Sequence, residues 1–375
     1  MTAAPSTKPR KRVFYLDLVR ALATVLVVIT HFNNPYLHQA QKRHVFAYEP
    51  FGVYIGNLGV SLFLIISGAA LTMTYGGPRL DLRVFYWKRF KGIYPMFWTA
   101  WILGTLYFFL ADHGVAKNHA PTRTFLFTFF GVDGMAANFH IQTMYLLGEW
   151  FLGFIVLFYI VFPLLRWAVM TYPKTTAAAI FAIYAVTFVL LNEIPHSFPN
   201  LIVLPLRLPE LAFGMYFVRY VHRLPTWAIL PWVLPCACVL IISARRPLLN
   251  EDFATPFVGV ACFFILAMAA RYLDVGPVRE PVALIAKYSY PIFLVHHVVI
   301  MKIFESTDTR AFSTLQLYML FAAMSIIVFG LSVGLHRLNA NVVAFFTRAF
   351  DGVTLLPRRR KAPEETPPAK DQTLS

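Results

Sequence analysis

Residues 13–32 read VFYLDLVRALATVLVVITHF, and this stretch decides the fold. Its length is what an α-helix needs to cross the hydrocarbon core of a bilayer. Two ionisable side chains, Arg20 and His31, lie eleven residues apart within it. Eleven residues make about three helical turns, so both side chains leave nearly the same face, roughly 16 Å apart along the axis. Ionisable residues inside membrane helices are costly and are therefore functional candidates.

The rest of the chain has the same character. It has 375 residues, of which 58% are hydrophobic and only 14% are charged, whereas a soluble domain carries about 25% charged residues. We therefore predict an all-α polytopic membrane protein with about ten transmembrane helices. The predicted spans are 13–32, 54–74, 93–111, 144–168, 175–191, 201–218, 227–244, 253–270, 285–303 and 315–335. The ninth is the weakest because Lys287 interrupts its start, and the sixth, with two prolines, is expected to be broken or kinked.

The net charge of +15 is explained by the orientation of the chain in the membrane. Lysines and arginines are concentrated in both tails and in the connections on the same side as these tails, as the positive-inside rule requires. Both termini are therefore predicted to be cytoplasmic, with anionic membrane lipids rather than nucleic acid attracted to the basic side. The predicted organisation is a basic cytoplasmic arm (1–12), one membrane domain (13–335) and a basic, partly disordered cytoplasmic tail (336–375).

Arg20 and His31 allow two interpretations. In one, Arg20 extends to the inner headgroups and His31 is merely interfacial. In the other, His31 is a general base near neutral pH and Arg20 holds an anionic group inside the bundle. Arg207 and Glu210, three residues apart, can touch on one helix face. They either neutralise each other in a broken helix or line the same cavity.

Other stretches are less specific. The connection 76–93 carries Lys88, Arg89 and Lys91 among aromatic residues, which suits the membrane interface and equally a phosphate-bearing ligand from the cytosol. The small residues between Gly56 and Gly68 favour close helix packing. Neither the histidines nor the three cysteines have the spacing of a metal site, so no metal is predicted.

Taken together, these stretches resemble the bacterial acyltransferase-3 family of integral membrane enzymes, in the family's order over nearly the whole chain. The matching segments are Tyr15 to Arg20 followed by His31, Gly59 to Gly68, Lys88 to Pro95, Trp150 to Pro163, Arg207 to Gly214, and Ser289-Tyr290 to His296. The pattern departs from the family at two positions. Gly92 stands where a second Arg is frequent, and Ile155 stands where a Glu is frequent.

The resemblance implies a bacterial plasma-membrane enzyme that moves an acyl group, usually acetyl, from cytosolic acyl-CoA. The acceptor would be a hydroxyl of an envelope glycan or its lipid-linked precursor, and no cofactor would be permanently bound. His31 would be catalytic with Arg20 as its partner. Substrate binding would fall to Arg89, Lys88, Lys91, Arg207, Glu210, Ser289, Tyr290 and His296.

Two alternatives remain open at this stage. A transporter or flippase of a polar or lipid-linked substrate also suits ten helices with buried charges, although the sequence shows no inverted repeat. A protein that binds a lipid or glycan precursor without converting it is the second alternative. If the chain is an enzyme, the donor's arm either threads through the bundle or passes its acyl group to a covalent intermediate. We favour threading, because no Cys or Ser stands out as a relay.

Overall fold

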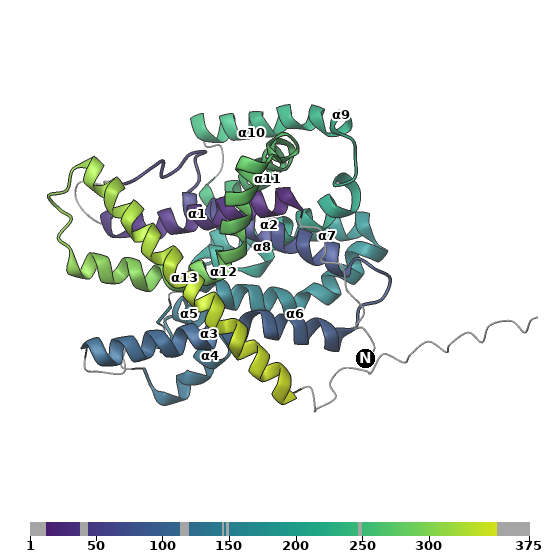
Figure 1. Cartoon of the computed structure of the whole chain (residues 1–375). Coiled ribbons are helices and arrows are strands. Elements are labelled where there is room, and N and C mark those ends of the chain that lie inside the picture. Colours follow the sequence, from purple (N-terminus) through teal and green to yellow (C-terminus); the bar gives the residue numbers. More distant parts are fainter. Residues whose placement is uncertain are drawn as a thin grey trace, which may run out of the picture.

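A computed structural model describes residues 13–37, 44–112, 120–144, 146–147, 150–246 and 250–350, and every regular element in these ranges is helical (Figure 1). The elements are α1 (Phe14–Leu37), α2 (Ile55–Tyr75), α3 (Leu82–Asp112), η1 (Thr122–Thr124), α4 (Phe125–Phe129), α5 (Asp133–Ala137), α6 (Trp150–Thr171), α7 (Pro173–Glu193), η2 (Asn200–Ile202), α8 (Leu204–Tyr216), η3 (Phe217–Val221), α9 (Thr226–Ile229), η4 (Leu230–Trp232), α10 (Val233–Arg245), α11 (Glu251–Leu273), α12 (Gly276–Ser306) and α13 (Thr314–Phe350).

The all-α membrane fold predicted from the sequence is confirmed. Within the described residues, nine helical segments are long and apolar enough to cross a membrane, the segment from α9 to α10 counting as one. The predicted sixth span is the tenth, shorter segment. Its α8 has 13 residues and is followed by the π-helical turn Phe217–Val221. Pro205 lies in the first turn, where a proline is tolerated, and Pro209 removes one hydrogen bond from the interior of this helix.

Several predicted boundaries are wrong. The fourth span begins at Trp150 and not at residue 144. The connection 76–93 is largely helical, because α3 begins at Leu82, where the Asp81 carboxylate accepts a hydrogen bond of 3.0 Å from the N–H of Val84. Lys287 does not interrupt its span and lies inside the 31-residue α12. Helix α13 continues to Phe350, past the predicted end at residue 335. The predicted basic arm and residues 351–375 lie outside the described residues.

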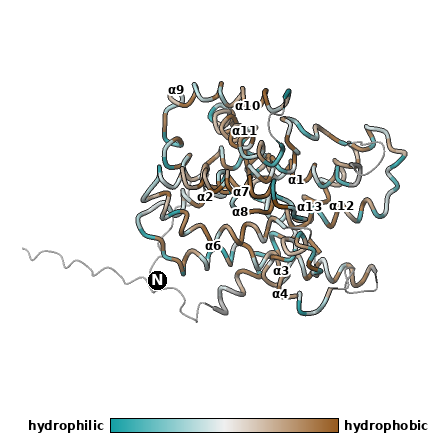
Figure 2. The backbone as a smooth tube through the Cα atoms, turned by 180° about the vertical axis from the view of Figure 1, so that it is seen from behind, coloured by the Kyte–Doolittle hydropathy of each residue, from teal (hydrophilic) through white to brown (hydrophobic). Residues whose placement is uncertain are grey.

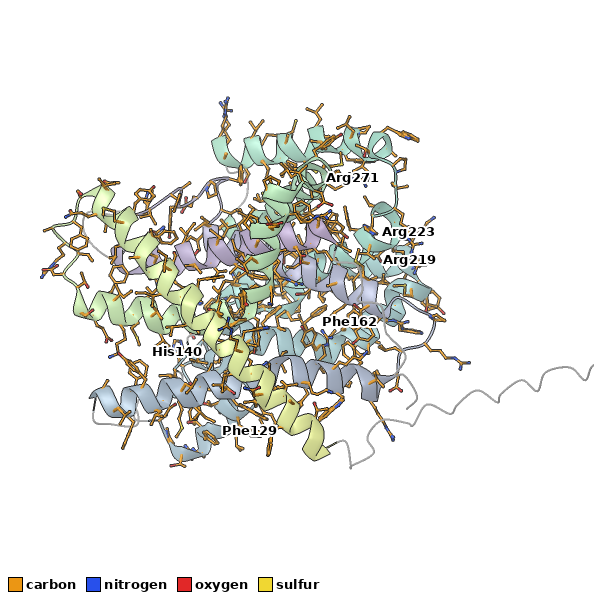
Figure 3. The ribbon with its side chains drawn as sticks, in the orientation of Figure 1. Phe129, His140, Phe162, Arg219, Arg223 and Arg271 are labelled. Atoms are coloured by element: carbon orange, nitrogen blue, oxygen red, sulfur yellow. The ribbon has the colours of Figure 1, made fainter. Side chains whose placement is uncertain are left out.

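The surface is that of a protein solvated by lipid. Large apolar side chains such as Leu164, Leu234 and Ile326 are at least 65% exposed, and Figure 2 shows apolar residues along most of the helical segments. Such a surface would aggregate in water and is stable in hydrocarbon. Figure 3 shows Arg219, Arg223 and Arg271 at the end of the bundle where α1 begins, as expected if that end is the cytoplasmic one.

Helix α2 packs against α8 through glycines. A Cβ added at Gly68 would lie 2.0 Å from the carbonyl oxygen of Leu211, and one added at Gly214 would lie 2.0 Å from that of Ile65. Only glycine permits this approach, which confirms the close packing predicted for residues 56–68.

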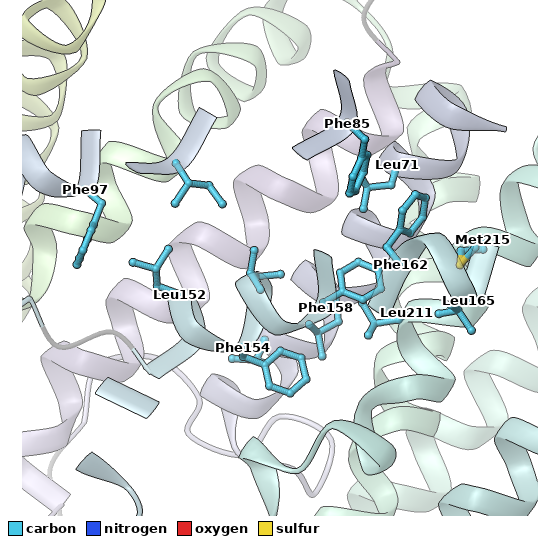
Figure 4. Packing of buried hydrophobic residues seen from close by; sticks show 14 of the residues in the cluster. Leu71, Phe85, Phe97, Leu152, Phe154, Phe158, Phe162, Leu165, Leu211 and Met215 are labelled. Atoms are coloured by element: carbon cyan, nitrogen blue, oxygen red, sulfur yellow. The ribbon is translucent and has the colours of Figure 1, made fainter. Parts of the chain in front are cut away.

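A core of phenylalanines lies beside this contact, between α3 and α6. Phe85 of α3 stacks on Phe162 of α6 with ring centroids 5.4 Å apart, and Phe154 and Phe158 follow on α6 (Figure 4). All four side chains are fully buried. Together with the glycine contact, this core joins α2, α3, α6 and α8.

Candidate active site

Helix α1 presents Arg20 and His31 to two different cavities. Both side chains are half-buried. Arg20 lines a cavity of about 320 Å³, here called the Arg20 cavity. His31 lines a second one of about 260 Å³, here called the His31 cavity. The sequence predicted one common face for the two residues, and the structure adds that this face is divided between two compartments.

The Arg20 cavity is cationic. Its walls come from α1, α2, α3, α6 and α12, and they include the side chains of Arg20, Lys287, Ser67, Ser289, Tyr290 and Tyr159. Among the described residues that line it, none is acidic. Two cations without a carboxylate in the lining suit an anionic or strongly polar ligand.

The hydroxyl groups of the Arg20 cavity are held by the backbone. Tyr290 donates a hydrogen bond of 3.0 Å to the carbonyl of Ile93, and Ser289 donates one of 3.1 Å to the carbonyl of Ala286. Ser67 donates to the carbonyl of Phe63 at 2.7 Å. Their oxygens keep lone pairs for a ligand, so these groups suit hydrogen-bond acceptance and do not resemble an activated nucleophile.

The His31 cavity is polar but carries no permanent charge. Its hydrogen-bonding side chains are Thr30, Asn34, Tyr54 and Asn57, and Trp150 adds an aromatic wall. The carboxylate of Glu251 accepts a 3.0 Å hydrogen bond from the backbone N–H of Tyr54, and a short one from the side-chain amide of Asn57. This contact ties the start of α11 to the start of α2 and fixes that wall. Neutral donors and acceptors around a histidine suit a ligand rich in hydroxyl groups.

His31 belongs to a group of three histidines. Its ring centroid lies 4.9 Å from that of His296 and 5.2 Å from that of His297, both in edge-to-face geometry. His296 is fully buried, and its Nδ1 lies 3.0 and 2.9 Å from the carbonyl oxygens of Ile292 and Phe293. These contacts favour the tautomer with the proton on Nδ1 and so fix the ring orientation.

The two cavities share one aromatic wall. Phe63 of α2, Phe151 of α6 and Phe293 of α12 line both of them. The ring of Phe151 lies 5.8 Å from that of Phe63 and 5.8 Å from that of Phe293. The three rings, here called the aromatic barrier, thus stand between Arg20 and His31.

Lys88, Arg89 and Lys91 do not form one cluster, because α3 directs neighbouring side chains to different faces. Arg89 is half-buried, with its guanidinium 5.5 Å from the ring centre of Tyr159 and 5.8 Å from that of Tyr75. Tyr159 also lines the Arg20 cavity, so one ring separates Arg89 from it. Lys88 is exposed, and Lys91 lies 5.2 Å from the ring centre of Trp87.

Arg207 and Glu210 lie in neither cavity. Their side chains form an ion pair of 3.0 Å within α8 and are 3% and 0% exposed. Of the alternatives left open by the sequence, the geometry favours the self-neutralising pair. Their assignment to substrate binding remains a prediction that this arrangement does not support.

The sequence did not indicate three residues at or beside these cavities. Lys287 lines the Arg20 cavity, His297 contacts His31, and Glu251 binds Tyr54 and Asn57. Lys287 was interpreted as a helix interruption, and the helix period relative to Ser289 and Tyr290 would have placed it on a neighbouring face. Glu251 gave no signal, because an acidic residue at the start of a helix is common for reasons of the helix dipole alone. Within the described part of the chain, no group of three or more His, Cys, Asp or Glu residues is placed to hold a metal ion.

Comparison with known proteins identifies the family. A family model described as an acyltransferase domain matches residues 13–337. No curated protein and no solved structure matches the sequence. The matched range contains both cavities and the aromatic barrier. The chain therefore belongs to the acyltransferase-3 family of membrane proteins.

Proposed function

We propose that this protein transfers an acyl group, with acetyl as the preferred one, from cytosolic acyl-CoA to a hydroxyl of an envelope carbohydrate or of its lipid-linked precursor. One observation carries the proposal: a cationic cavity and a neutral cavity with a histidine open from the same face of α1. The first matches an anionic donor and the second a polyol acceptor. On the family analogy the enzyme would act in a bacterial plasma membrane.

In this mechanism the donor occupies the Arg20 cavity. At about 320 Å³ the cavity is at the small end of ligand sites, so it would take the pantetheine arm while the nucleotide stays nearer the cytosol. Arg20 and Lys287 would hold the polar groups of that arm or a phosphate. Arg89, with Lys88 and Lys91 on the outer faces of α3, would guide the nucleotide phosphates.

The chemical step takes place at His31. The imidazole removes the proton of the acceptor hydroxyl, whose oxygen attacks the carbonyl carbon of the thioester. The tetrahedral intermediate breaks its C–S bond, and the imidazolium returns the proton to the departing thiolate. The products are an ester and free coenzyme A. The thioester is already activated, so one base and hydrogen-bond donors such as Asn34 and Tyr54 around the oxyanion suffice.

The test measures base-labile ester on envelope glycans in cells that produce the wild-type protein, His31→Ala or His222→Ala at matched membrane abundance. His222 lies outside both cavities and is the matched control. We expect ester with the wild type and with His222→Ala, and none with His31→Ala. If His31→Ala produces as much ester as the wild type, His31 is not the general base. Equal ester in cells without the protein would refute the proposed acceptor class.

Purified protein separates the enzyme from a transporter or a mere binding protein. His31→Ala is expected to bind acetyl-CoA as the wild type does, because His31 does not line the Arg20 cavity, and to release no thiol in the presence of envelope membranes. If the wild-type protein binds no acyl-CoA, the proposal that acyl-CoA is the donor is refuted.

A further inference from the structure

We infer that the aromatic barrier of Phe63, Phe151 and Phe293 is a gate that the acyl group must pass and that sets which acyl groups reach His31. The inference rests on the proposed function and deepens it, because it names the residues that determine the length of the transferred acyl chain. It follows from where the three rings lie and from what stands on each side of them.

The first observation is the position of the rings. They come from the three helices α2, α6 and α12, and each ring lines both cavities. Arg20 and His31 are about three helical turns apart on that face. A donor held at Arg20 reaches His31 by the shortest route only between these rings.

The second observation is that the rings are less well packed than their neighbours. On α6, Phe154, Phe158 and Phe162 are fully buried (Figure 4), whereas Phe151 on the same helix is half-buried, as are Phe63 and Phe293. All three rings line both cavities, so each is covered by fewer side chains than the core phenylalanines are. We expect such rings to change rotamer without opening the core.

The third observation is the contrast between the two compartments. One carries Arg20 and Lys287, and the other carries neutral polar groups and His31. An apolar ring wall between them keeps water from the thioester until the acyl group has passed. Without that wall, water would replace the acceptor: its oxygen would bond to the acyl carbon, the C–S bond would break, and the products would be the free acid and coenzyme A.

The width of such a gate discriminates by chain length. A pocket distinguishes ligands by one methylene with a factor of about 10–200. Replacing Phe151, the central ring of the three, by alanine removes the whole ring and should admit longer chains. Replacing it by tryptophan should close the gate against all donors while leaving the Arg20 cavity able to bind them.

The experiment uses membranes from producing cells as the source of both enzyme and acceptor, with acetyl-, butyryl- and hexanoyl-CoA as donors. Ester-bound acyl groups are released with mild base and measured, as is thiol release in detergent-purified protein without acceptor. Phe151→Ala is expected to raise the hexanoyl-to-acetyl transfer ratio at least tenfold and to increase acceptor-independent hydrolysis. Phe181→Ala, an exposed ring on α7, should leave both values at the wild-type level.

The outcomes separate the two proposals. If the wild type transfers acyl groups but neither Phe151→Ala nor the milder Phe151→Leu changes the ratio, the gate is refuted and the proposed function stands. If Phe151→Trp transfers acetyl as well as the wild type, the route between the rings is also refuted. If the wild type neither binds nor transfers from any of the three donors, the proposed function itself fails and the gate with it.

Discussion

Breaking the ion pair between Arg207 and Glu210 distinguishes a structural role from a role in substrate binding. The two side chains are 3.0 Å apart and almost completely buried. Glu210→Ala leaves the guanidinium without its partner in the interior, which costs about 3–5 kcal/mol of folding free energy in buried pairs. The double variant Arg207→Met/Glu210→Leu removes both charges at similar volume, and such replacements are neutral or stabilising by about 1–4 kcal/mol.

The assay is reversible unfolding in mixed micelles with increasing SDS, followed by helical circular dichroism, for the wild type, the single variants Glu210→Ala and Arg207→Ala, and the double variant. Acetyl-CoA binding is measured on the same samples. We expect the single variants to lose stability and the double variant to recover it and to bind donor normally, because neither residue lines the Arg20 cavity. If the double variant is stable but no longer binds acetyl-CoA, this reasoning is refuted and Arg207 and Glu210 take part in substrate binding.

Three further predictions concern the donor, the packing and the pH dependence. Lys287→Ala should weaken acetyl-CoA binding about tenfold in equilibrium dialysis, through loss of one charge-assisted contact, with Lys302→Ala at the far end of α12 unchanged. Gly68→Ala should cost about 1–3 kcal/mol in SDS unfolding because its Cβ meets a backbone carbonyl of α8; Gly330→Ala, which meets nothing within 4 Å, should not. Burial raises the pKa of Asp133, in the connection between α3 and α6, to about 6. Its charged form therefore destabilises the fold increasingly from about pH 4 to pH 6, by about 3 kcal/mol in total. Asp133→Asn should accordingly be more stable than the wild type at pH 8 and not at pH 4. If the difference in free energy of unfolding between the two proteins is the same at both pH values, the raised pKa of Asp133 is contradicted.

The membrane fold was predictable because hydrocarbon imposes a simple rule. Each backbone polar group must be satisfied within its own segment, so apolar runs of spanning length become helices. The irregular sixth span was predicted from its two prolines, although Pro95 and Pro291 lie inside the 31-residue helices α3 and α12 without ending them. The start of α3 was not, because its basic residues resemble a loop by composition, whereas the cap at Asp81 and the aromatic contacts of Arg89 make the segment helical.

The candidate site was predictable only along single helices. The helix period predicts Arg20 and His31 on one face of α1, and the structure places them in two cavities that share three rings. The division of this face into two cavities depends on Phe63, Phe151 and Phe293, which come from three distant helices. The sequence holds 36 phenylalanines, and nothing in their local pattern separates these three from those that fill the core. Tertiary packing alone selects them.

The two departures from the family pattern fall at one place in the structure. Gly92 and Ile155 both line the Arg20 cavity, from α3 and α6 respectively. An arginine at the first position and a glutamate at the second would face the same space with opposite charges, so losing both leaves the net charge of the wall unchanged. Losing only the arginine would have weakened the attraction for an anionic donor, and losing only the glutamate would have strengthened it. In this chain the cationic side chains of the lining are those of Arg20 and Lys287. The Arg20 cavity therefore keeps the positive charge that the proposed anionic donor requires.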